Sequence, residues 1–377
     1  MIRAIIMKLL MITTIAGTQK FFLPLIRELT DRGVQVDIAC SRSETLHPDL
    51  KEISHAVFDI PFSRSPLSRG NLTAKKQLKG IVEQGEYDIV HCHTPVAALC
   101  TRLACRKSRK KGLKVVYTAH GFHFYKGAPL KNWLIFYPAE WLCSFWTDLL
   151  ITITSEDFKR AQKKMHAKRT EYLPGVGIDV EKFQNVSIDK SAKRREIGVP
   201  ANALLLLSVG ELNTNKNHSF VIRLLSRSEL ASVHYAVAGD GEKDAELKSL
   251  ALESGVKDRV HLLGRRNDVA ELLHAADVYL LPSIREGLNV SVMEAMSAGL
   301  PVVCNDIRGN DDLIKNGEGG FLCALNDEGA WLNAICALAE LPEKRGKMGE
   351  YNIVASEQYS MGQIIEKTLS LYREITE

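Results

Sequence analysis

The stretch from Leu281 to Gly309 reads LPSIREGLNVSVMEAMSAGLPVVCNDIRG. It begins at the end of the apolar run Val278–Leu281, which predicts a buried strand. A polar loop follows, and the spacing of apolar residues then predicts a helix over residues 289–298. Gly-Leu-Pro ends this helix and leads into a second apolar run, Val302–Cys304. A strand, a helix and another strand in this order predict a parallel α/β sheet.

The same alternation continues through both halves of the chain. Apolar runs predict buried strands at Lys8–Thr14, Val34–Cys40, Ile89–His91, Val115–Ala119 and Leu149–Thr152, and again at Leu204–Val209, His234–Ala238, Val260–Leu263, Val278–Leu281 and Val302–Cys304. Amphipathic segments between them, such as Lys20–Asp31 and Asp244–Glu253, predict connecting helices. Two such series predict an α/β protein made of two doubly wound, Rossmann-like domains.

A length of 377 residues suits two domains better than one. Proline and glycine punctuate the segment 172–183, so we place the first domain at 1–175 and the second at 176–360. The first 180 residues carry 27 Lys+Arg against 16 Asp+Glu, whereas the remainder carries 22 against 29. The two domains are therefore expected to meet different partners. Ligands bind beyond the carboxyl ends of parallel strands, so two such domains facing each other would form a cleft between them.

The beginning of the chain allows two interpretations. Arg3 and Lys8 before an apolar stretch resemble a signal peptide, but no small-residue cleavage site follows. We therefore expect a buried strand at 9–12 and a turn at 13–18. No apolar run reaches the ~20 residues that cross a bilayer. None of the eight cysteines lies in a CxxC pair or at zinc-ligand spacing, which predicts reduced thiols, a cytoplasmic protein and no metal site.

The loop and helix at the centre of this stretch carry the groups of a candidate site. Gly287 lets a ligand approach the backbone, and the free N–H groups of residues 287–290 at a helix start attract anions. Glu286 and Glu294 bracket this spot, and a carboxylate can accept hydrogen bonds from two neighbouring sugar hydroxyls. Anion and diol recognition side by side predict a nucleotide-sugar site. The alternative is a helix with a solvated glutamate at each end.

The pattern Glu286-x7-Glu294, continued by AMSAGLPVV, resembles the signature of glycosyltransferase family 4, whose members are retaining enzymes of the GT-B fold. The resemblance implies that Glu294 binds the ribose hydroxyls of the donor. It implies that Glu286 is a catalytic residue beside the transferred sugar. The backbone amides of Gly287, Leu288 and Asn289 would contact the sugar and the diphosphate, and no metal or other cofactor is expected.

Two further segments of the second half resemble parts of this family. Residues 209–217, VGELNTNKN, resemble its diphosphate loop, where an Arg usually follows the first Gly and a Lys comes five residues later. Lys216 fits this pattern, but Glu211 replaces the Arg, so either Arg285 or another nearby base compensates or Glu211 points away. Arg265 lies in the segment that would receive the base of the donor. The sequence GDGE at 239–242 is expected to form a turn and a helix cap rather than a metal site.

Histidines mark the strand ends of the first half. By resemblance His120, directly after a predicted strand, is a catalytic residue that positions the donor sugar, although a buried structural histidine is the alternative. His123 is a candidate for the acceptor side. Alternation places His91 and His93 on one strand face, where they line the cleft or belong to the core, and His93 is also assigned to the acceptor side. Gly17 resembles the family's glycine loop in reduced form and is counted among the donor-binding residues.

Aromatic residues gather in residues 133–146, which contain three of the four tryptophans, and the basic run RKSRKK begins at Arg106. One interpretation is an aromatic core helix beside a solvated charged loop. The other is peripheral contact with an anionic membrane, with aromatic side chains at the interface and lysines and arginines at the headgroups. By resemblance, a helix at 361–377 packs back onto the first domain.

The function we expect is retaining transfer of a hexose or N-acetylhexosamine from a nucleotide-sugar, a UDP-sugar, to a saccharide acceptor. As in many bacterial relatives, the acceptor would be polyprenyl-linked, and the reaction would serve surface polysaccharide biosynthesis at the inner face of the plasma membrane. The alternatives are a catalytically silent nucleotide- or saccharide-binding scaffold and a nucleotide-sugar epimerase. Nucleic acid is not an expected partner, because the basic residues lack an identifiable module with base-stacking aromatics.

Overall fold

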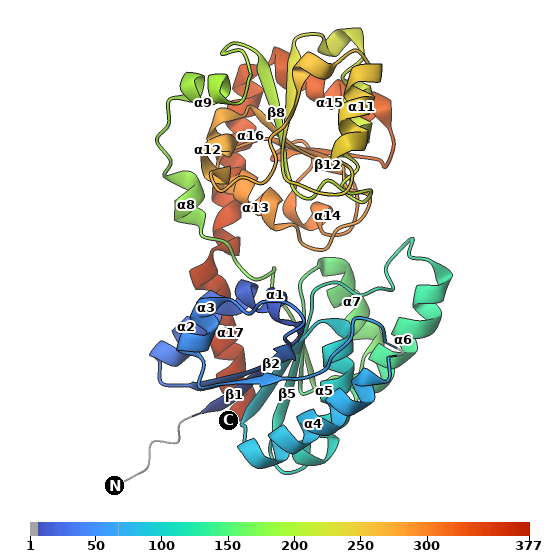
Figure 1. The fold of residues 1–377 in the computed structure, drawn as a ribbon, viewed down its shortest axis with the longest axis vertical. Coiled ribbons are helices and arrows are strands. Elements are labelled where there is room, and N and C mark those ends of the chain that lie inside the picture. The colour runs from blue at the N-terminus through green and yellow to red at the C-terminus, as the bar shows by residue number, and fades with distance from the viewer. Residues whose placement is uncertain (1–6, 67) are drawn as a thin grey trace. The chain divides into compact units, whose positions relative to one another are not determined.

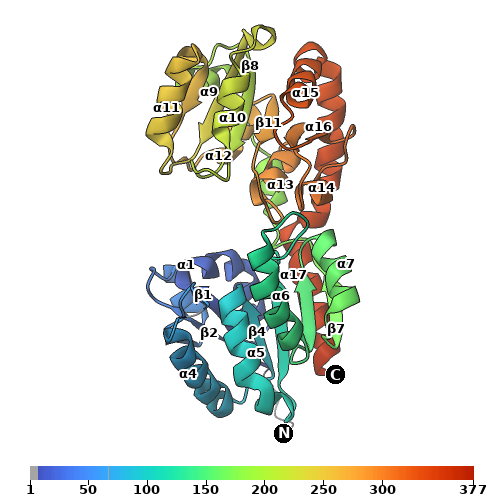
Figure 2. The same ribbon diagram turned by 90° about the vertical axis from the view of Figure 1, so that its right-hand side faces the viewer.

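The computed structural model describes residues 7–66 and 68–377, so Arg3, on which the signal-peptide interpretation partly depends, lies outside the described residues. The chain forms two compact units (Figure 1, Figure 2). The first ends at Val176 and also takes in Met361–Glu377, and the second is Gly177–Ser360. Among the described residues, no helix has both the length and the apolar character needed to cross a membrane.

A seven-stranded parallel sheet forms the centre of the first unit, in the order β3-β2-β1-β4-β5-β6-β7. Its strands are β1 (Lys8–Ile15), β2 (Gln35–Ser41), β3 (Ala56–Asp59), β4 (Ile89–His93), β5 (Lys114–Ala119), β6 (Leu149–Thr152) and β7 (Arg169–Tyr172). The prediction missed β3 and β7. Both are four-residue edge strands, and each is only partly buried, so neither shows the continuous apolar run of a central strand.

The helices of the first unit are α1 (Ala16–Gln19), α2 (Leu23–Asp31), α3 (Pro48–Ile53), α4 (Gly70–Gly85), α5 (Pro95–Arg109), α6 (Leu130–Ser144), α7 (Ser155–Lys164) and α17 (Met361–Thr376). The turn expected at 13–18 is wrong, because β1 continues to Ile15 and α1 follows at once. The helix expected at Lys20–Asp31 begins as a 3₁₀ turn, and α2 starts at Leu23 with a proline in its first turn.

A six-stranded parallel sheet forms the centre of the second unit, in the order β10-β9-β8-β11-β12-β13. Its strands are β8 (Leu204–Val209), β9 (Val233–Ala238), β10 (Val260–Leu262), β11 (Val278–Leu281), β12 (Val302–Asn305) and β13 (Gly320–Cys323). The edge strand β13 was not predicted, because it is four residues long and starts with glycine. The order reverses between β8 and β11, as it does between β1 and β4, and ligands bind at such switch points.

The helices of the second unit are α8 (Val180–Gln184), α9 (Lys190–Glu196), α10 (His218–Leu224), α11 (Asp244–Glu253), α12 (Val269–Ala275), α13 (Val290–Ser297), α14 (Asn310–Leu313), α15 (Glu328–Glu340) and α16 (Pro342–Ser356). The helix predicted over 289–298 is confirmed by α13. The cap expected from the GDGE segment is wrong, because Lys243 precedes α11 and no side chain caps that helix.

Helix α17 is an integral part of the first unit. Its buried residues Ile364, Leu369 and Tyr372 belong to the core cluster that also contains Leu9 and Met11 of β1. The hydroxyl of Tyr372 lies 2.5 Å from a ring nitrogen of His91 on β4. Residues almost three hundred positions apart in sequence therefore share one core.

The opposite face of this sheet contains a buried ion pair. Arg102 of α5 is 1% exposed, and its Nη1 lies 2.8 Å from Oε2 of Glu140 on α6, which is 7% exposed. The guanidinium also lies 4.3 Å from the centre of the Tyr117 ring. Two opposite charges that are out of water stabilise each other only while both are present.

We expect Arg102→Leu to lower the free energy of unfolding by about 3–5 kcal/mol, because it leaves the Glu140 carboxylate buried without a cation. The double variant Arg102→Leu with Glu140→Leu should recover most of that loss, since no buried charge remains. Urea unfolding followed by tryptophan fluorescence measures both, because three of the four tryptophans lie in the first unit. Equal destabilisation in the single and double variants would contradict the expectation.

Candidate active site

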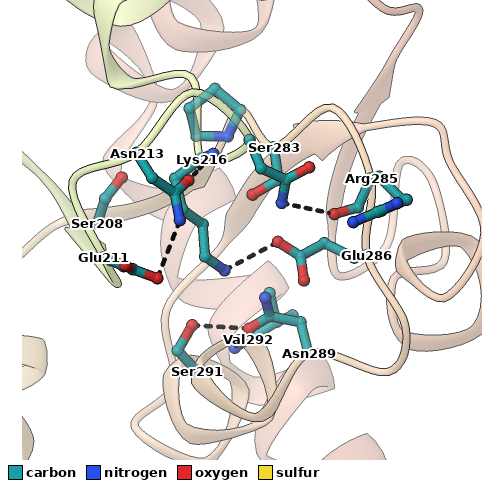
Figure 3. Close-up of polar contacts among 12 residues, drawn as sticks. Ser208, Glu211, Asn213, Lys216, Ser283, Arg285, Glu286, Asn289, Ser291 and Val292 are labelled. Carbon is teal, nitrogen blue, oxygen red and sulfur yellow. Dashed lines mark hydrogen bonds and ion pairs between the residues drawn. The ribbon is translucent and has the colours of Figure 1, made fainter. Parts of the chain in front are cut away.

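Two loops meet at the carboxyl ends of β8 and β11, the adjacent strands at the switch point of the second unit. The backbone N–H of Ile284 donates to the carbonyl of Asn215 at 2.9 Å, and the side-chain amide of Asn215 donates to the carbonyl of Arg285 at 2.9 Å. The side-chain amide of Asn217 donates to the carbonyl of Pro282 at 3.3 Å. Segments 70 residues apart in sequence are thus held together as one unit (Figure 3).

Lys216 and Glu286 form an ion pair between these loops. Lys216 Nζ lies 2.8 Å from Glu286 Oε1, and the two side chains are 18% and 13% exposed. The sequence analysis assigned both residues to the site but did not predict that they form an ion pair. A pair so little exposed interacts more strongly than a surface pair, so each charge fixes the position of the other in the ligand-free site.

Glu211 does not take part in this pair. Its side chain is exposed and accepts a hydrogen bond from the side-chain amide of Asn213 at 3.0 Å, while the carbonyl oxygen of that amide accepts one from the backbone N–H of Lys216 at 2.9 Å. Figure 3 shows Lys216 pointing toward Glu286 and not toward Glu211. Of the two alternatives, the geometry favours a Glu211 side chain that points away from the lysine.

Arg308 is a residue near the site that the prediction missed. Its Nη2 donates to the carbonyl of Glu286 at 3.3 Å, which places a second cation beside the loop after β11. The sequence held a signal for it, since Arg308 follows β12, the strand next to β11, at the same edge of the sheet. Arg285, the base considered as a replacement cation, has an exposed side chain. Its backbone carbonyl accepts the hydrogen bond from Asn215.

Gly309 lies against the backbone of the loop after β11, which carries Glu286 and is called the glutamate loop below. Its φ is +85°, a conformation that favours glycine, and a Cβ atom there would lie 1.8 Å from the carbonyl oxygen of Gly287. The loop after β12 therefore supports the loop after β11 by direct backbone contact.

The start of α13 is fixed by its capping residue. The side-chain oxygen of Asn289 accepts hydrogen bonds from the backbone N–H of Val292 at 3.2 Å and from the hydroxyl of Ser291 at 2.7 Å. The hydroxyl of Tyr279 on β11 donates to Ser291 at 2.6 Å. The first N–H groups of a helix carry partial positive charge, so this helix start can hold an anion next to Gly287.

Glu294 lies in the second turn of α13 and is partly buried. Burial raises the pKa of its carboxyl to about 7, and the nearby Lys182 of α8 only partly opposes this shift. A solvated surface glutamate would keep an ordinary pKa, so the alternative of a solvated glutamate at each end of the helix does not fit this residue.

The histidines of the first unit form a cluster at the carboxyl ends of β4 and β5. His93 Nδ1 lies 3.0 Å from His120 Nε2, and the His91 and His93 rings are 4.1 Å apart on one face of β4, as alternation predicted. His93 is 2% exposed, and its ring lies tilted against that of Phe22 with 3.9 Å between the ring centres. Of the two alternatives for His93, the structure favours the core, because the side chain is buried next to His120; its assignment to the acceptor side stays a prediction.

The contacts of His93 also fix the proton positions in this cluster. Its Nε2 lies 3.0 Å from the sulfur of Met11, which can only accept a weak hydrogen bond, so Nε2 carries the proton. His93 Nδ1 must then accept from Nε2–H of His120, which leaves Nδ1 of His120 as a hydrogen-bond acceptor. Burial lowers the pKa of His120 to about 4 and that of His91 to about 3, so both rings are neutral near pH 7.

A separate pocket of ≈ 370 Å³ lies at the carboxyl ends of β1 and β4, and His123 is among its lining residues together with Arg64, Thr14 and Thr94. The His123 ring stacks on Phe136 at 4.4 Å. Thr94 has a φ of +65°, which is unusual for a β-branched residue and typical of strained positions at functional sites.

Two predicted residues remain, one in each unit. Gly17 lies in the short helix α1, where a Cβ atom would meet the carboxylate of Glu44. Arg265 is exposed on the loop after β10 in the second unit. Within the described part of the chain, no group of three or more His, Cys, Asp or Glu side chains has the arrangement of a metal site.

Comparison with known proteins gives matches over both units. Residues 15–182 match the model of "Glycosyltransferase Family 4", and residues 189–354 match that of "Glycosyl transferases group 1". The chain is 38% identical over 356 residues to EpsD of Bacillus subtilis, which is named as a glycosyltransferase, covering 93% of this chain and 92% of that one. It is 28% identical to an Escherichia coli UDP-Gal:α-D-GlcNAc-diphosphoundecaprenol α-1,3-galactosyltransferase, with 86% and 85% of the two chains covered.

Solved structures show the same fold. The Anabaena protein HepE in complex with UDP superposes with a TM-score of 0.82 at 21% identity, covering 98% of this chain and all of that one. WaaG, a glycosyltransferase of lipopolysaccharide biosynthesis, has a TM-score of 0.75 at 20% identity, with 97% of this chain and 99% of that one covered. The predicted fold class, two doubly wound α/β domains of the GT-B type, is confirmed.

We expect Gly309→Ala to destabilise the protein by about 3 kcal/mol or more, because it adds both left-handed strain and a backbone clash. Gly317→Ala is the matched control. Its φ is +84°, but no atom lies within 4 Å of the added Cβ, so only the strain of about 1–2 kcal/mol applies. Urea unfolding of the two variants measures the difference, and equal losses would show that the contact with Gly287 is unimportant.

Proposed function

The chain belongs to glycosyltransferase family 4, and from this premise we propose that it transfers a hexose or N-acetylhexosamine from a UDP-sugar to a saccharide acceptor with retention of configuration. The observation that carries the proposal is the convergence of Lys216, Glu286 and the start of α13 at one strand end, with Glu294 one turn further along the helix. Cations, backbone amides and a carboxylate at this spacing suit a nucleoside diphosphate and its sugar.

The candidate site residues of the second unit would bind the donor in this proposal. Glu294 accepts hydrogen bonds from the ribose hydroxyls, and the amides of Gly287, Leu288 and Asn289 bind the sugar and the diphosphate. Lys216, with the helix start, offsets the negative charge that develops on the leaving diphosphate. Arg308 adds a further positive charge beside this loop, which supports transfer without a metal ion. Gly17 and Arg265 remain assigned to the donor, with Arg265 near the base.

Glu286 and His120 are the proposed catalytic residues. Glu286 orients Lys216 and lies beside the transferred sugar. His120 presents Nδ1 as a neutral acceptor for a hydroxyl of that sugar, because His93 receives its Nε2–H. In the reaction the bond from the anomeric carbon to the phosphate oxygen breaks, and a bond to the acceptor oxygen forms on the same face. The proton of the acceptor hydroxyl moves to the departing phosphate, so no protein nucleophile is required.

The identities of donor and acceptor are drawn from relatives. Structures of HepE contain UDP, UDP with glucose, and UDP-glucose, which favours a uridine donor here. The E. coli relative is named for a diphosphoundecaprenol-linked acceptor. We therefore propose a polyprenyl-linked saccharide acceptor, which contacts the first unit near His123 and its pocket, and a role in surface polysaccharide biosynthesis at the cytoplasmic face of the membrane.

We expect UDP, among UDP, GDP, ADP and CMP, to raise the thermal unfolding midpoint in the presence of EDTA. At a hundredfold excess over Kd, bound ligand stabilises the folded state by about 2.7 kcal/mol. Glu294→Ala should remove the effect, whereas Glu253→Ala, a change at an exposed position of α11, should not. Product analysis by NMR then separates a retained glycoside from an epimerised nucleotide-sugar. Stabilisation without any turnover on saccharide acceptors would favour a binding scaffold.

UDP affinity should fall as the pH drops below about 7, because the ribose hydroxyls bind the ionised form of Glu294 and its pKa of about 7 falls on binding. Calorimetry between pH 5.5 and 8.5 should show proton release on binding below this value. In Glu294→Gln the phosphate groups of UDP still titrate, but the contribution of the Glu294 carboxyl to the pH dependence of affinity is lost.

In the free protein the same raised pKa makes the charged Glu294 carboxyl unfavourable. Glu294→Gln should therefore increase the free energy of unfolding at pH 8 and not at pH 4. If wild type and Glu294→Gln showed the same pH dependence of UDP affinity and of stability, the proposed role of Glu294 would be refuted.

A further inference from the structure

Helix α6 of the first unit is apolar on two opposite faces. Its inner face packs against the core through Trp133, Phe136 and Tyr137, and Cys143 on the same face is buried. The outer face carries large apolar side chains that are 39% to 73% exposed, namely Leu130, Leu134, Ile135, Trp141, Leu142 and, directly after the helix, Phe145. The steps from 130 to 134, 141 and 145 follow the helical repeat, so these side chains form one continuous stripe.

The surface helix α7 of the same unit lacks such a stripe. The outer positions of α7 hold Lys159, Gln162, Lys163 and Lys164, as expected for a helix that faces water. A helix that is hydrophobic all round is normally buried in a protein or in contact with lipid. Helix α6 lies on the outside of its unit, beyond α5 (Figure 1, Figure 2). A contiguous exposed apolar surface of this kind marks an interaction site.

Positive charge lies at both ends of the stripe. At the carboxyl end, the guanidinium of Arg106 lies 4.4 Å from the centre of the Trp146 ring, and exposed Lys107, Lys110 and Lys111 follow it in the chain. At the amino end, Lys126 and Lys131 are exposed. The single acidic side chain of α6 is Glu140, which is buried and paired with Arg102. The outer face of α6 therefore combines apolar and cationic groups without an exposed carboxylate.

We propose that the outer face of α6 docks onto an anionic lipid bilayer, with the helix lying in the plane of the interface. Its 15 residues span about 22 Å, too short to cross a bilayer but long enough to lie along one. The apolar stripe enters the boundary between headgroups and acyl chains, and the flanking lysines and arginines meet the lipid phosphates. Charge complementarity favours this occupant over a second copy of the chain, whose basic residues would repel these.

Vesicle co-sedimentation of the full chain, without nucleotide, tests the proposal independently of donor binding. We expect binding to vesicles of phosphatidylcholine with 30% phosphatidylglycerol, and much weaker binding to phosphatidylcholine alone, at an ionic strength of about 0.1 M. Leu134→Glu with Ile135→Glu should lower the partition coefficient by about tenfold or more, because two apolar contacts are replaced by charges. Leu252→Glu with Val354→Glu, two exposed apolar positions of the second unit, should leave binding unchanged.

A second variant separates the charges from the apolar stripe. Replacing Arg106, Lys107, Lys110 and Lys111 by glutamine should weaken binding by roughly 600-fold, since each basic residue near an anionic surface contributes about fivefold. Each variant should retain the thermal midpoint of the wild type and its response to UDP. Equal binding of wild type and variants to both vesicle types would overturn the proposal. So would a wild-type dimer in light scattering that Leu134→Glu dissociates while no vesicle binding occurs, which would assign the face to self-association.

Discussion

Parallel strands end at the same edge of a sheet, and this constraint positions every polar group of the candidate site. Because β11 pairs with β8 at the point where strand order reverses, the loops after these strands must lie side by side although they are 70 residues apart in sequence. Asn215 and Asn217 then satisfy backbone groups of the second loop. The pairing of Lys216 with Glu286, and the position of α13 beside them, depend on this arrangement.

The central strands and the glutamate loop could be read from the sequence, because buried parallel strands are continuous apolar runs and the loop residues have a distinctive pattern. The edge strands β3, β7 and β13 could not, since their burial depends on neighbours that are distant in sequence. The ion pair of Lys216 and the contact of Arg308 with Glu286 are tertiary in origin. For His93, alternation gave the correct face of β4 but not its depth beneath His120.

The ligand-free site of the second unit carries less net charge than its residue types suggest. Lys216 and Glu286 offset each other, and burial holds the pKa of Glu294 near 7, so this carboxyl is only partly ionised at neutral pH. Such a site avoids much of the cost of isolated buried charges. Its hydrogen-bonding groups are nevertheless fixed in place by Asn213, Asn289 and the backbone contact of Gly309. An anionic ligand would therefore enter a site whose binding groups are already ordered and whose net charge is small.

The membership of α17 in the first unit has a consequence for synthesis of the protein. The second unit is continuous in sequence from Gly177 to Ser360, whereas the first is completed only by residues that follow it. On the ribosome, the face of the first sheet that packs against Ile364, Leu369 and Tyr372 stays uncovered until the second unit has been made. The second unit can therefore reach its native state before the first, which reverses the usual order of domain folding along a nascent chain.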